Sequence, residues 1–309
     1  MKTSSFYLLV LLFSNCSVNT SVDKISHSPV EQRIKKLTEE IAELEKKDDL
    51  EGFLMHYDNA IISMPEYQLT LTGLAEIRTF YKEIFSRQKI NTFKRNTEEI
   101  IVIDSTAIEI GTFKKEYQDS KTDSTFTQNG KYWNIWSAKS DGSFKIKGEA
   151  FGYFHHIKSP EGLVVQSNNK QPDESEILLT NQIPFELKAY NALMEKGVRN
   201  RDGVLRSEFF TNDAKFMPFA DSTKKGIEKI KPYLIAYNAG TVTIDSIMVY
   251  TYHYENFKDY VIEYAMFKVK WTIAQLSGRT EGKGIRIWKR QEDNSLKLFR
   301  EIGTHNLNQ

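Results

Sequence analysis

GKYWNIWSAKSDGSFKIKGE (Gly130–Glu149) returns later in the chain as GKGIRIWKRQEDNSLKLFRE (Gly282–Glu301), at a constant offset of 152 residues and without a gap. Eight of the twenty aligned positions are identical, where chance would give roughly one or two. In both copies, alternating apolar and polar residues flank a turn, Asp141-Gly142-Ser143 in the first and Asp293-Asn294-Ser295 in the second. This pattern predicts a β-hairpin, so the chain contains the same hairpin twice.

The repeat extends beyond the hairpin through most of each half. The other matching pairs, at offsets of 153 or 154 residues, are His56–Pro65 with Phe209–Pro218, Gly73 with Gly226, and Ile108–Lys115 with Ile262–Val269. An amphipathic helical pattern follows the glycine in both halves. Each half therefore reads as a helix, a short strand, a second helix and then three or more alternating strands.

The length of 309 residues fits about two domains, each large enough to bury its own core. We predict a first domain at residues 29–157, a linker rich in prolines and amides at 158–176, and a second domain at 177–309. Ser28 and Pro29 should open the first helix, because serine caps a helix and proline fits its first position. The expected core-facing stripe of the matching helix in the second domain is Phe185, Ala189, Ala192 and Leu193.

The N-terminus resembles that of an exported bacterial lipoprotein. A basic residue precedes an apolar run, Phe6–Phe13, that is too short to span a bilayer. Residues 1–16 therefore read as a secretory signal, and Cys16, the only cysteine, stands where lipoproteins carry their lipid, although Asn15 replaces the usual small residue. Cleavage without lipidation is the alternative. We expect a polar tether at 17–28, attachment to a membrane through Cys16, and a location in the periplasm or at the outer membrane.

A block with the pattern A-x-x-M-P followed by G-x-x-x-I occurs in the second half and, with one extra residue before the methionine, in the first. Its residues are Ala214, Met217, Pro218, Gly226 and Ile230, and Ala60, Met64, Pro65, Gly73 and Ile77. With the closing hairpin at Trp288–Ile302, this block resembles the nuclear transport factor 2-like superfamily, also called SnoaL-like. The resemblance implies an α+β fold of two tandem cone-shaped, cystatin-like domains, each a curved antiparallel sheet wrapped around N-terminal helices, with a pocket at its open end. Members commonly pair through their sheets, so it also implies an intrachain pseudo-dimer or a homodimer.

Enzymes of this superfamily, including ketosteroid isomerase-like members, transfer protons with a pocket carboxylate and a tyrosine or second acid. Glu109 and Glu263 are the first candidates, because strand alternation places each beside a small and an aromatic residue. A carboxyl group among apolar neighbours has a raised pKa and can act near neutral pH. The alternative places both at a solvated rim, paired with Lys or Arg, and the same alternative holds for the repeated pair Glu149 and Glu301.

Asp213 is a further candidate base, with Tyr264 or Tyr237 as its partner. Asp58, near the same place in the first half, does not align with Asp213 in the register that the two Met-Pro pairs set. A catalytic role shared by both halves is therefore weakly supported.

The recurring hairpin and the strand beside it supply candidates for ligand binding. A tryptophan next to a hydrogen-bonding group suits the floor of a pocket. The expected pocket residues are Trp136, Asn134 and Phe113 in the first domain and Trp288, Arg286 and Phe267 in the second. The alternative is that each tryptophan fills the core of its cone or the interface between the sheets.

Several classes of function lack their usual residues. A net charge of +1 gives no global attraction to nucleic acid or to acidic substrates. The six histidines include no H-x-H or H-E-x-x-H, so we expect no metal. The glycine motifs that cradle phosphates and the G-x-S-x-G of hydrolases are missing, so we expect no nucleotide cofactor and no serine nucleophile.

The hypothesis that ranks first is an exported binding module for a small apolar or amphipathic ligand, or for an envelope protein. The second is an isomerase, hydratase or cyclase that uses a pocket carboxylate as general acid or base. The third is a structural spacer of two domains. Binding ranks above catalysis because no complete catalytic set repeats in both halves.

Overall fold

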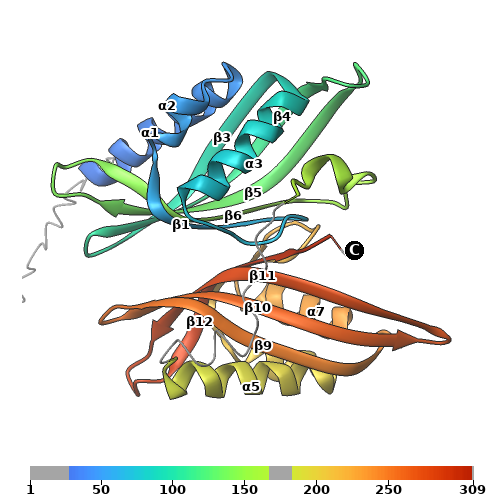
Figure 1. The fold of residues 1–309 in the computed structure, drawn as a ribbon. Coiled ribbons are helices and arrows are strands. Elements are labelled where there is room, and N and C mark those ends of the chain that lie inside the picture. Colours follow the sequence, from blue (N-terminus) through green and yellow to red (C-terminus); the bar gives the residue numbers. More distant parts are fainter. Residues whose placement is uncertain (1–27, 167–182, 308–309) are drawn as a thin grey trace, which may run out of the picture.

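The computed structural model describes residues 28–166 and 183–307, which form two α+β halves with the same order of elements (Figure 1). The first half contains α1 (Pro29–Lys46), α2 (Leu50–Leu54), β1 (Tyr57–Pro65), β2 (Leu71–Thr72), α3 (Leu74–Arg87), β3 (Gln88–Ile103), β4 (Thr106–Asp119), β5 (Thr125–Ala138), β6 (Phe144–Tyr153) and η1 (Pro160–Leu163). The second half contains α5 (Phe185–Arg199), α6 (Gly203–Ser207), β7 (Phe210–Met217), β8 (Lys224–Lys225), α7 (Ile227–Asn238), β9 (Thr243–Asn256), β10 (Tyr260–Ile273), β11 (Leu276–Arg290) and β12 (Leu296–His305). The predicted signal with Cys16, the tether up to residue 27, and linker residues 167–176 lie outside the described residues.

Each half has one six-stranded sheet, and the two sheets share one topology. The strand orders are β2-β1-β6-β5-β4-β3 and β8-β7-β12-β11-β10-β9. Neighbouring strands are antiparallel except β1 with β6 and β7 with β12, which are parallel. The predicted α+β fold of two tandem domains is confirmed, whereas the sheets are mixed and not wholly antiparallel. The parallel pairs are possible because a helix and several strands separate their members in the chain, which leaves room for a crossover.

The repeated hairpin that the sequence predicts is present in both halves. Asp141 Oδ1 accepts the N–H of Ser143 at 2.9 Å, and Asp293 Oδ1 accepts that of Ser295 at 2.9 Å. Both turns pass through the left-handed region, at Gly142 in the first half (φ 79°) and at an asparagine in the second. Glycine and asparagine tolerate this region better than other residues, which explains the turn composition.

The helices confirm one expectation and correct another. Ser28 Oγ accepts the N–H of Glu31 at 3.3 Å, so α1 begins as predicted. In α5 the expected core stripe is wrong, since Phe185 is 84% exposed and the buried side chains include Leu187 and Asn191. The buried face of this helix carries a polar residue with a partner inside the cone, and apolar spacing alone cannot reveal such a face.

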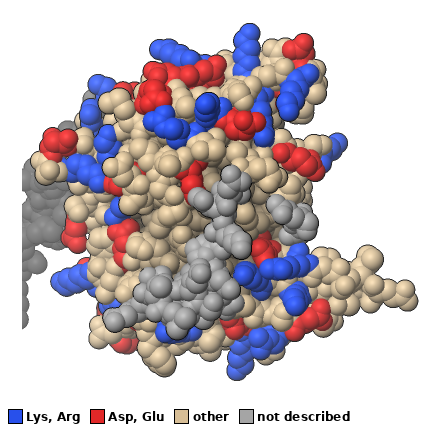
Figure 2. All heavy atoms as spheres, in the orientation of Figure 1, with Lys and Arg blue, Asp and Glu red and all other residues tan. Residues whose placement is uncertain are grey.

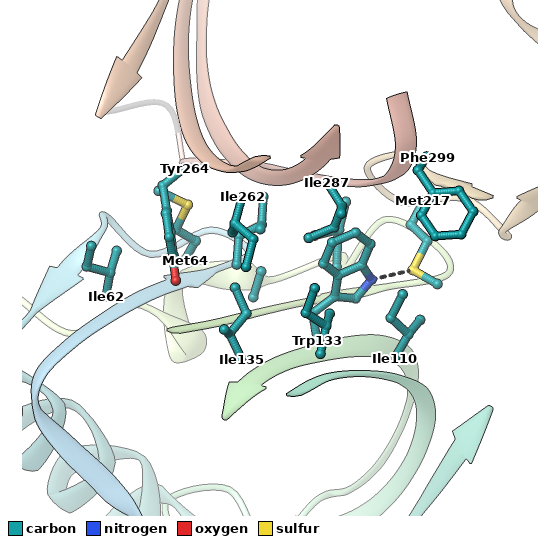
Figure 3. Packing of buried hydrophobic residues seen from close by; sticks show 14 of the residues in the cluster. Ile62, Met64, Ile110, Trp133, Ile135, Met217, Ile262, Tyr264, Ile287 and Phe299 are labelled. Carbon is teal, nitrogen blue, oxygen red and sulfur yellow. Dashed lines mark hydrogen bonds between the residues drawn. The ribbon is translucent and has the colours of Figure 1, made fainter. Parts of the chain in front are cut away.

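The two sheets pack face to face, and the helices cover their outer faces (Figure 1). The packed residues between the sheets come from both halves and include Met64, Trp133, Met217, Tyr264 and Ile287 (Figure 3). Trp133 Nε1 lies 3.1 Å from Met217 Sδ, so the interface also carries a directional contact between the halves. Separate apolar clusters fill the space between each sheet and its own helices.

Among the helices of the described residues, none combines the length and the apolar character that crossing a membrane requires. On the face that Figure 2 shows, basic and acidic side chains are interspersed, and the uncharged tip of the β10–β11 hairpin projects from the body.

Candidate functional site

Glu109 on β4 and Glu263 on β10 lie at equivalent places inside the two domains, and both are 0% exposed. An indole N–H donates to each carboxylate. Trp136 Nε1 lies 3.0 Å from Glu109 Oε2. Trp288 Nε1 lies 2.8 Å from Glu263 Oε2. The solvated-rim alternative is therefore wrong for both glutamates, although its pairing with an arginine is present at Glu263, 3.5 Å from Arg286.

In each domain, one side chain of the first helix and one of the first long strand also donate hydrogen bonds to the buried carboxylate. In the first domain the donors are Thr38 of α1 at 2.8 Å and Thr97 of β3 at 2.6 Å. In the second they are Asn191 of α5 at 3.2 Å and Thr251 of β9 at 2.5 Å. These positions correspond in the repeat at offsets of 153 and 154 residues. Both halves therefore contain the same buried carboxylate with the same arrangement of donors.

The carboxylate of Glu109 has no lone pair left for a ligand. Tyr132 OH at 2.9 Å and Asn134 Nδ2 at 3.2 Å donate to it in addition to the donors named above. A carboxylate offers about four acceptor sites, and five side chains already use them. Glu109 therefore joins α1 to strands β3, β4 and β5 and does not face a substrate.

A cavity of about 50 Å³ lies in the first cone, bounded by α1, α3, η1 and strands β3 to β6. Aromatic rings form much of its wall, among them Phe93, Phe113 and Tyr153. Of the three pocket residues predicted in this domain, Phe113 and Asn134 line the cavity. Trp136 lies instead in the core between the sheet and its helices.

Two cations in the wall of this cavity share one carboxylate. Lys115 Nζ lies 2.7 Å from Glu45 Oε1, and the guanidinium of Arg95 lies 3.7 Å from Glu45 Oε2. Both cations also lie against the ring of Phe93, at 5.0 and 5.1 Å from its centroid. Glu45 thus pairs with both cations, and its single negative charge balances one of their two positive charges.

Glu149 of β6, the second repeated glutamate, is held by neutral hydroxyl groups. Ser63 Oγ donates to it at 2.6 Å, Tyr57 OH at 3.0 Å and Tyr81 OH at 3.2 Å. Glu149 lines the cavity and is 2% exposed. Burial raises its pKa, against the opposing effect of these hydrogen bonds. The rim alternative is wrong for this residue as well.

Glu66, directly after β1, is the least satisfied polar group of the cavity. It is 1% exposed, and its Oε2 accepts the backbone N–H of Tyr153 at 3.2 Å. Its Oε1 is buried and has no hydrogen bond of regular geometry among the described residues, although the backbone N–H of Ala220 also acts on this carboxylate and favours its charged form. Burial raises the pKa of Glu66 to about 7, although the charges of Lys131 and Lys283 oppose this shift. The carboxyl group therefore titrates near neutral pH.

A strap of residues 157–166, mostly assigned to the linker by sequence, covers the mouth of this cone. Leu163 lines the cavity and is 7% exposed. Arg87 of α3 donates to the carbonyl oxygens of Gly162 at 3.0 Å and Val164 at 2.8 Å. The amide of Gln68 pairs with the backbone of Val165 in both directions, at 2.8 and 3.1 Å. The strap thus forms part of the cavity wall.

The second cone differs because an arginine occupies the position of Asn134. Arg286 is 8% exposed and lies between Glu263 and Glu301, at 3.5 and 3.0 Å. Its Nη1 also donates to Asn191 Oδ1 at 3.0 Å. Burial alone would lower the pKa of Arg286, but the two carboxylates raise it above its usual value. The arginine side chain thus fills the space between the two glutamates of this cone.

The other predicted site residues lie outside both cones or in packed cores. Asp213 is exposed on β7 and Tyr237 is 62% exposed, so neither is placed to act inside a pocket. Tyr264 is buried in the cluster between the sheets, away from the hydrogen-bonding partners of Glu263. Trp288 packs between its sheet and helices. Phe267 contacts the ring of His305, with 5.5 Å between ring centroids. These placements correct the sequence-based assignment, because strand alternation gives a face but not what packs on it.

Residues of the cavity that sequence reasoning missed include Glu45, Glu66, Arg95 and Lys115. Comparison of the two halves finds only residues that occur in both. Glu66 does not recur, because Phe219 occupies its position in the second half. The sequence pointed to Glu66 as a cavity residue only through its charge, directly after the Met64-Pro65 pair. Within residues 28–166 and 183–307, no three His, Cys, Asp or Glu side chains gather as a metal site would require.

No family model matches the chain, and no curated protein matches it in sequence. Among solved structures, a ketosteroid isomerase-like protein from Erwinia carotovora atroseptica is 10% identical and matches over 42% of this chain and 100% of its own, with a TM-score of 0.40. A nuclear transport factor 2-like protein from Cytophaga hutchinsonii is 12% identical over 41% of this chain and 100% of its own, with a TM-score of 0.36. A nuclear transport factor 2-like superfamily protein from Salmonella enterica is 12% identical and matches over 40% of this chain and 89% of its own, with a TM-score of 0.36. Each match spans about 40% of the chain. The chain is thus similar in fold to nuclear transport factor 2-like and ketosteroid isomerase-like proteins, as the sequence resemblance predicted.

Proposed function

We propose that the first domain binds a small amphipathic molecule in its cone and that the second domain supports it without binding. The observation that carries this proposal is the contrast at one repeated position. Asn134 and Glu149 line a cavity in the first cone, whereas the longer side chain of Arg286 lies between Glu263 and Glu301 at the equivalent position of the second. Aromatic rings beside charged groups in the wall suit a ligand with both an apolar and a polar part.

The sharpest test transfers the arginine to the first cone. Asn134→Arg should fill the cavity and remain folded, because Glu109 and Glu149 flank this position as Glu263 and Glu301 flank Arg286. Native mass spectrometry of the protein purified from its source should detect a bound small molecule. We expect Asn134→Arg to lose this molecule and Asn212→Arg, a change at an exposed position, to keep it. Equal retention by both variants would contradict the proposal.

A second candidate function is proton transfer by Glu66, since a carboxyl group with a pKa of about 7 can act as acid or base at neutral pH. A carboxyl group that removes a carbon-bound proton and exchanges it with water before returning it leaves deuterium in the molecule. The retained molecule should therefore incorporate deuterium in heavy water with the wild-type protein and not with Glu66→Gln. A molecule that gains no deuterium with the wild-type protein would leave binding as the function.

We also propose export and lipid attachment at Cys16, a proposal that rests on the sequence pattern alone. Cys16→Ser should move the protein from the membrane fraction to the soluble fraction and abolish labelling by a radioactive fatty acid. Unchanged fractionation would argue for a cleaved or unattached protein. An envelope protein as partner, or a purely structural role as spacer, would be favoured if the first cone binds no small molecule.

A further inference from the structure

We propose that the ligand of the first cone is a small organic cation, an ammonium with an apolar part, and that Glu66 receives its charged nitrogen. This inference rests on the proposed binding function of the cavity. The charges that line the cavity, an unfilled hydrogen bond and the aromatic wall support it.

The lining contains more acidic groups than its cations can pair. Lys115 and Arg95 both contact Glu45. Within the described residues, neither Glu66 nor Glu149 has a Lys or Arg nitrogen within ion-pair distance. A ligand with a negative charge would thus meet two buried carboxyl groups and no free cation of the cavity wall.

Two buried lysines lie near Glu66, but their ammonium groups are bound elsewhere. Lys131 Nζ donates to the carbonyl oxygens of Tyr153, Pro218 and Asp221. Lys283 Nζ donates to Gln68 O and to Asn306 Oδ1. Three bonds use all the donors of Lys131. These lysines influence Glu66 through their charge and do not supply the hydrogen bond that its Oε1 lacks.

A buried carboxyl oxygen without a partner is costly, and a donor that supplies one is correspondingly favourable. A charged nitrogen makes the stronger, charge-assisted hydrogen bond to a carboxylate. The rings of Phe113 and Tyr153 lie 6.1 Å apart at 78° in the same wall. Aromatic faces attract cations, so they favour an ammonium over a neutral alcohol of equal size.

The volume of the cavity limits the ligand. About 50 Å³ is room for roughly three or four water-sized groups. Ethylammonium is a suitable probe, with ethanol as the neutral analogue of equal size and acetate as the anionic one. Isothermal titration calorimetry of the folded protein at pH 8, above the pKa of Glu66 of about 7, should give measurable binding for ethylammonium alone.

Glu66→Gln keeps the shape of the side chain and removes its charge, and it should weaken ethylammonium binding at least about tenfold. Glu228→Gln changes an exposed glutamate of the second domain and should leave the affinity unchanged. If Glu66→Gln does not fold, the three-probe comparison on the wild-type protein still decides the question. If ethanol binds as well as ethylammonium, the cation inference is wrong while the proposed function stands. If no probe binds and no molecule is retained from the source, both fail.

Discussion

At the scale of single residues, the two buried glutamates illustrate how one repeated carboxylate can be structural in both halves. The hydrogen bonds to Glu109 come from helix α1 and from β3 and β5, the two strands that flank β4, so its removal affects the whole first cone. The sequence therefore suggests that Glu109 is a pocket acid, whereas its hydrogen bonds hold together the elements around it. Its effect is on stability.

Glu109→Ala should lower the free energy of unfolding by about 4 kcal/mol, because several buried donors lose their acceptor at once. Urea unfolding followed by circular dichroism measures this change. Glu116→Ala, on the same strand but partly exposed, is the matched control and should change stability by less than about 0.5 kcal/mol. A loss at Glu109 as small as that of the control would show that its hydrogen bonds contribute little.

His305, at the end of β12, gives a pH prediction at the same scale. Its ring stacks on Phe219, with 3.9 Å between centroids. Burial, with the charge of Lys283, lowers the pKa of His305 from 6.5 to about 3. Between pH 3 and 6.5 the unfolded chain therefore binds more protons here than the folded protein, so this contribution to stability is lost as pH falls through that window.

The variant His305→Gln should show a weaker fall in unfolding free energy between pH 6.5 and pH 4 than the wild-type protein. Urea unfolding at several pH values measures both slopes, and the difference between them removes the contribution of other groups. The slopes above pH 7 should agree. Identical slopes below pH 6.5 would mean that His305 keeps an ordinary pKa.

At the scale of elements, the two cones differ in what closes them. The strap at residues 157–166 covers the first cone and is fixed by Arg87 and Gln68. In the second cone Arg286 fills the interior from β11. The same helices and sheet thus enclose a cavity in one half and an ion-paired core in the other.

Gln68→Ala should loosen the strap without unfolding the domain, because the side chain bonds only to the backbone of Val165. Hydrogen exchange of the Val165 amide should accelerate at least about tenfold, since its acceptor is lost. Gln118→Ala, which removes a surface amide bound to the turn at Asp123, serves as control. Unchanged protection of Val165 would show that Arg87 and packing alone hold the strap.

Arg286→Asn copies the first cone into the second and should destabilise the protein by about 3 to 5 kcal/mol, because Glu263 and Glu301 lose their buried partner. Arg279→Asn lies on the same strand but changes a side chain that is 59% exposed, so it should change stability by less than about 1 kcal/mol. Urea unfolding compares the two. Equal effects would indicate that the buried ion pairs contribute no more than an exposed one.

At the scale of the whole molecule, the inner faces of the sheets form one continuous apolar cluster with residues from both halves (Figure 3). Lys131 and Lys283, which occupy equivalent positions in the repeat, also join the two halves, because each donates a hydrogen bond to a backbone carbonyl of the other half. We therefore expect the interface to couple the unfolding of the two domains.

Trp133→Ala should cost about 3 to 5 kcal/mol, the usual range for deleting a large buried aromatic side chain. We expect the wild-type protein to unfold in one calorimetric transition and the variant in two, since the contact between the domains is weakened. Trp271→Ala, at a partly exposed hairpin position, should keep a single transition. A single transition in both variants would show that the domains stay coupled without this residue.

The sequence by itself determined the local patterns: the repeated hairpin with its Asp-Gly-Ser and Asp-Asn-Ser turns, the capped start of α1, the order of elements and the division into two similar halves. These follow from turn chemistry, capping and periodicity, which act between residues close in the chain. Only the tertiary structure decided that Glu109 and Glu263 are fully hydrogen-bonded, that Glu66 has an oxygen without a regular hydrogen bond beside a cavity, and that Arg286 fills the second cone. Each of these depends on donors brought together from distant strands and helices, and the burial and charge that result have no counterpart in the spacing of residues along the chain.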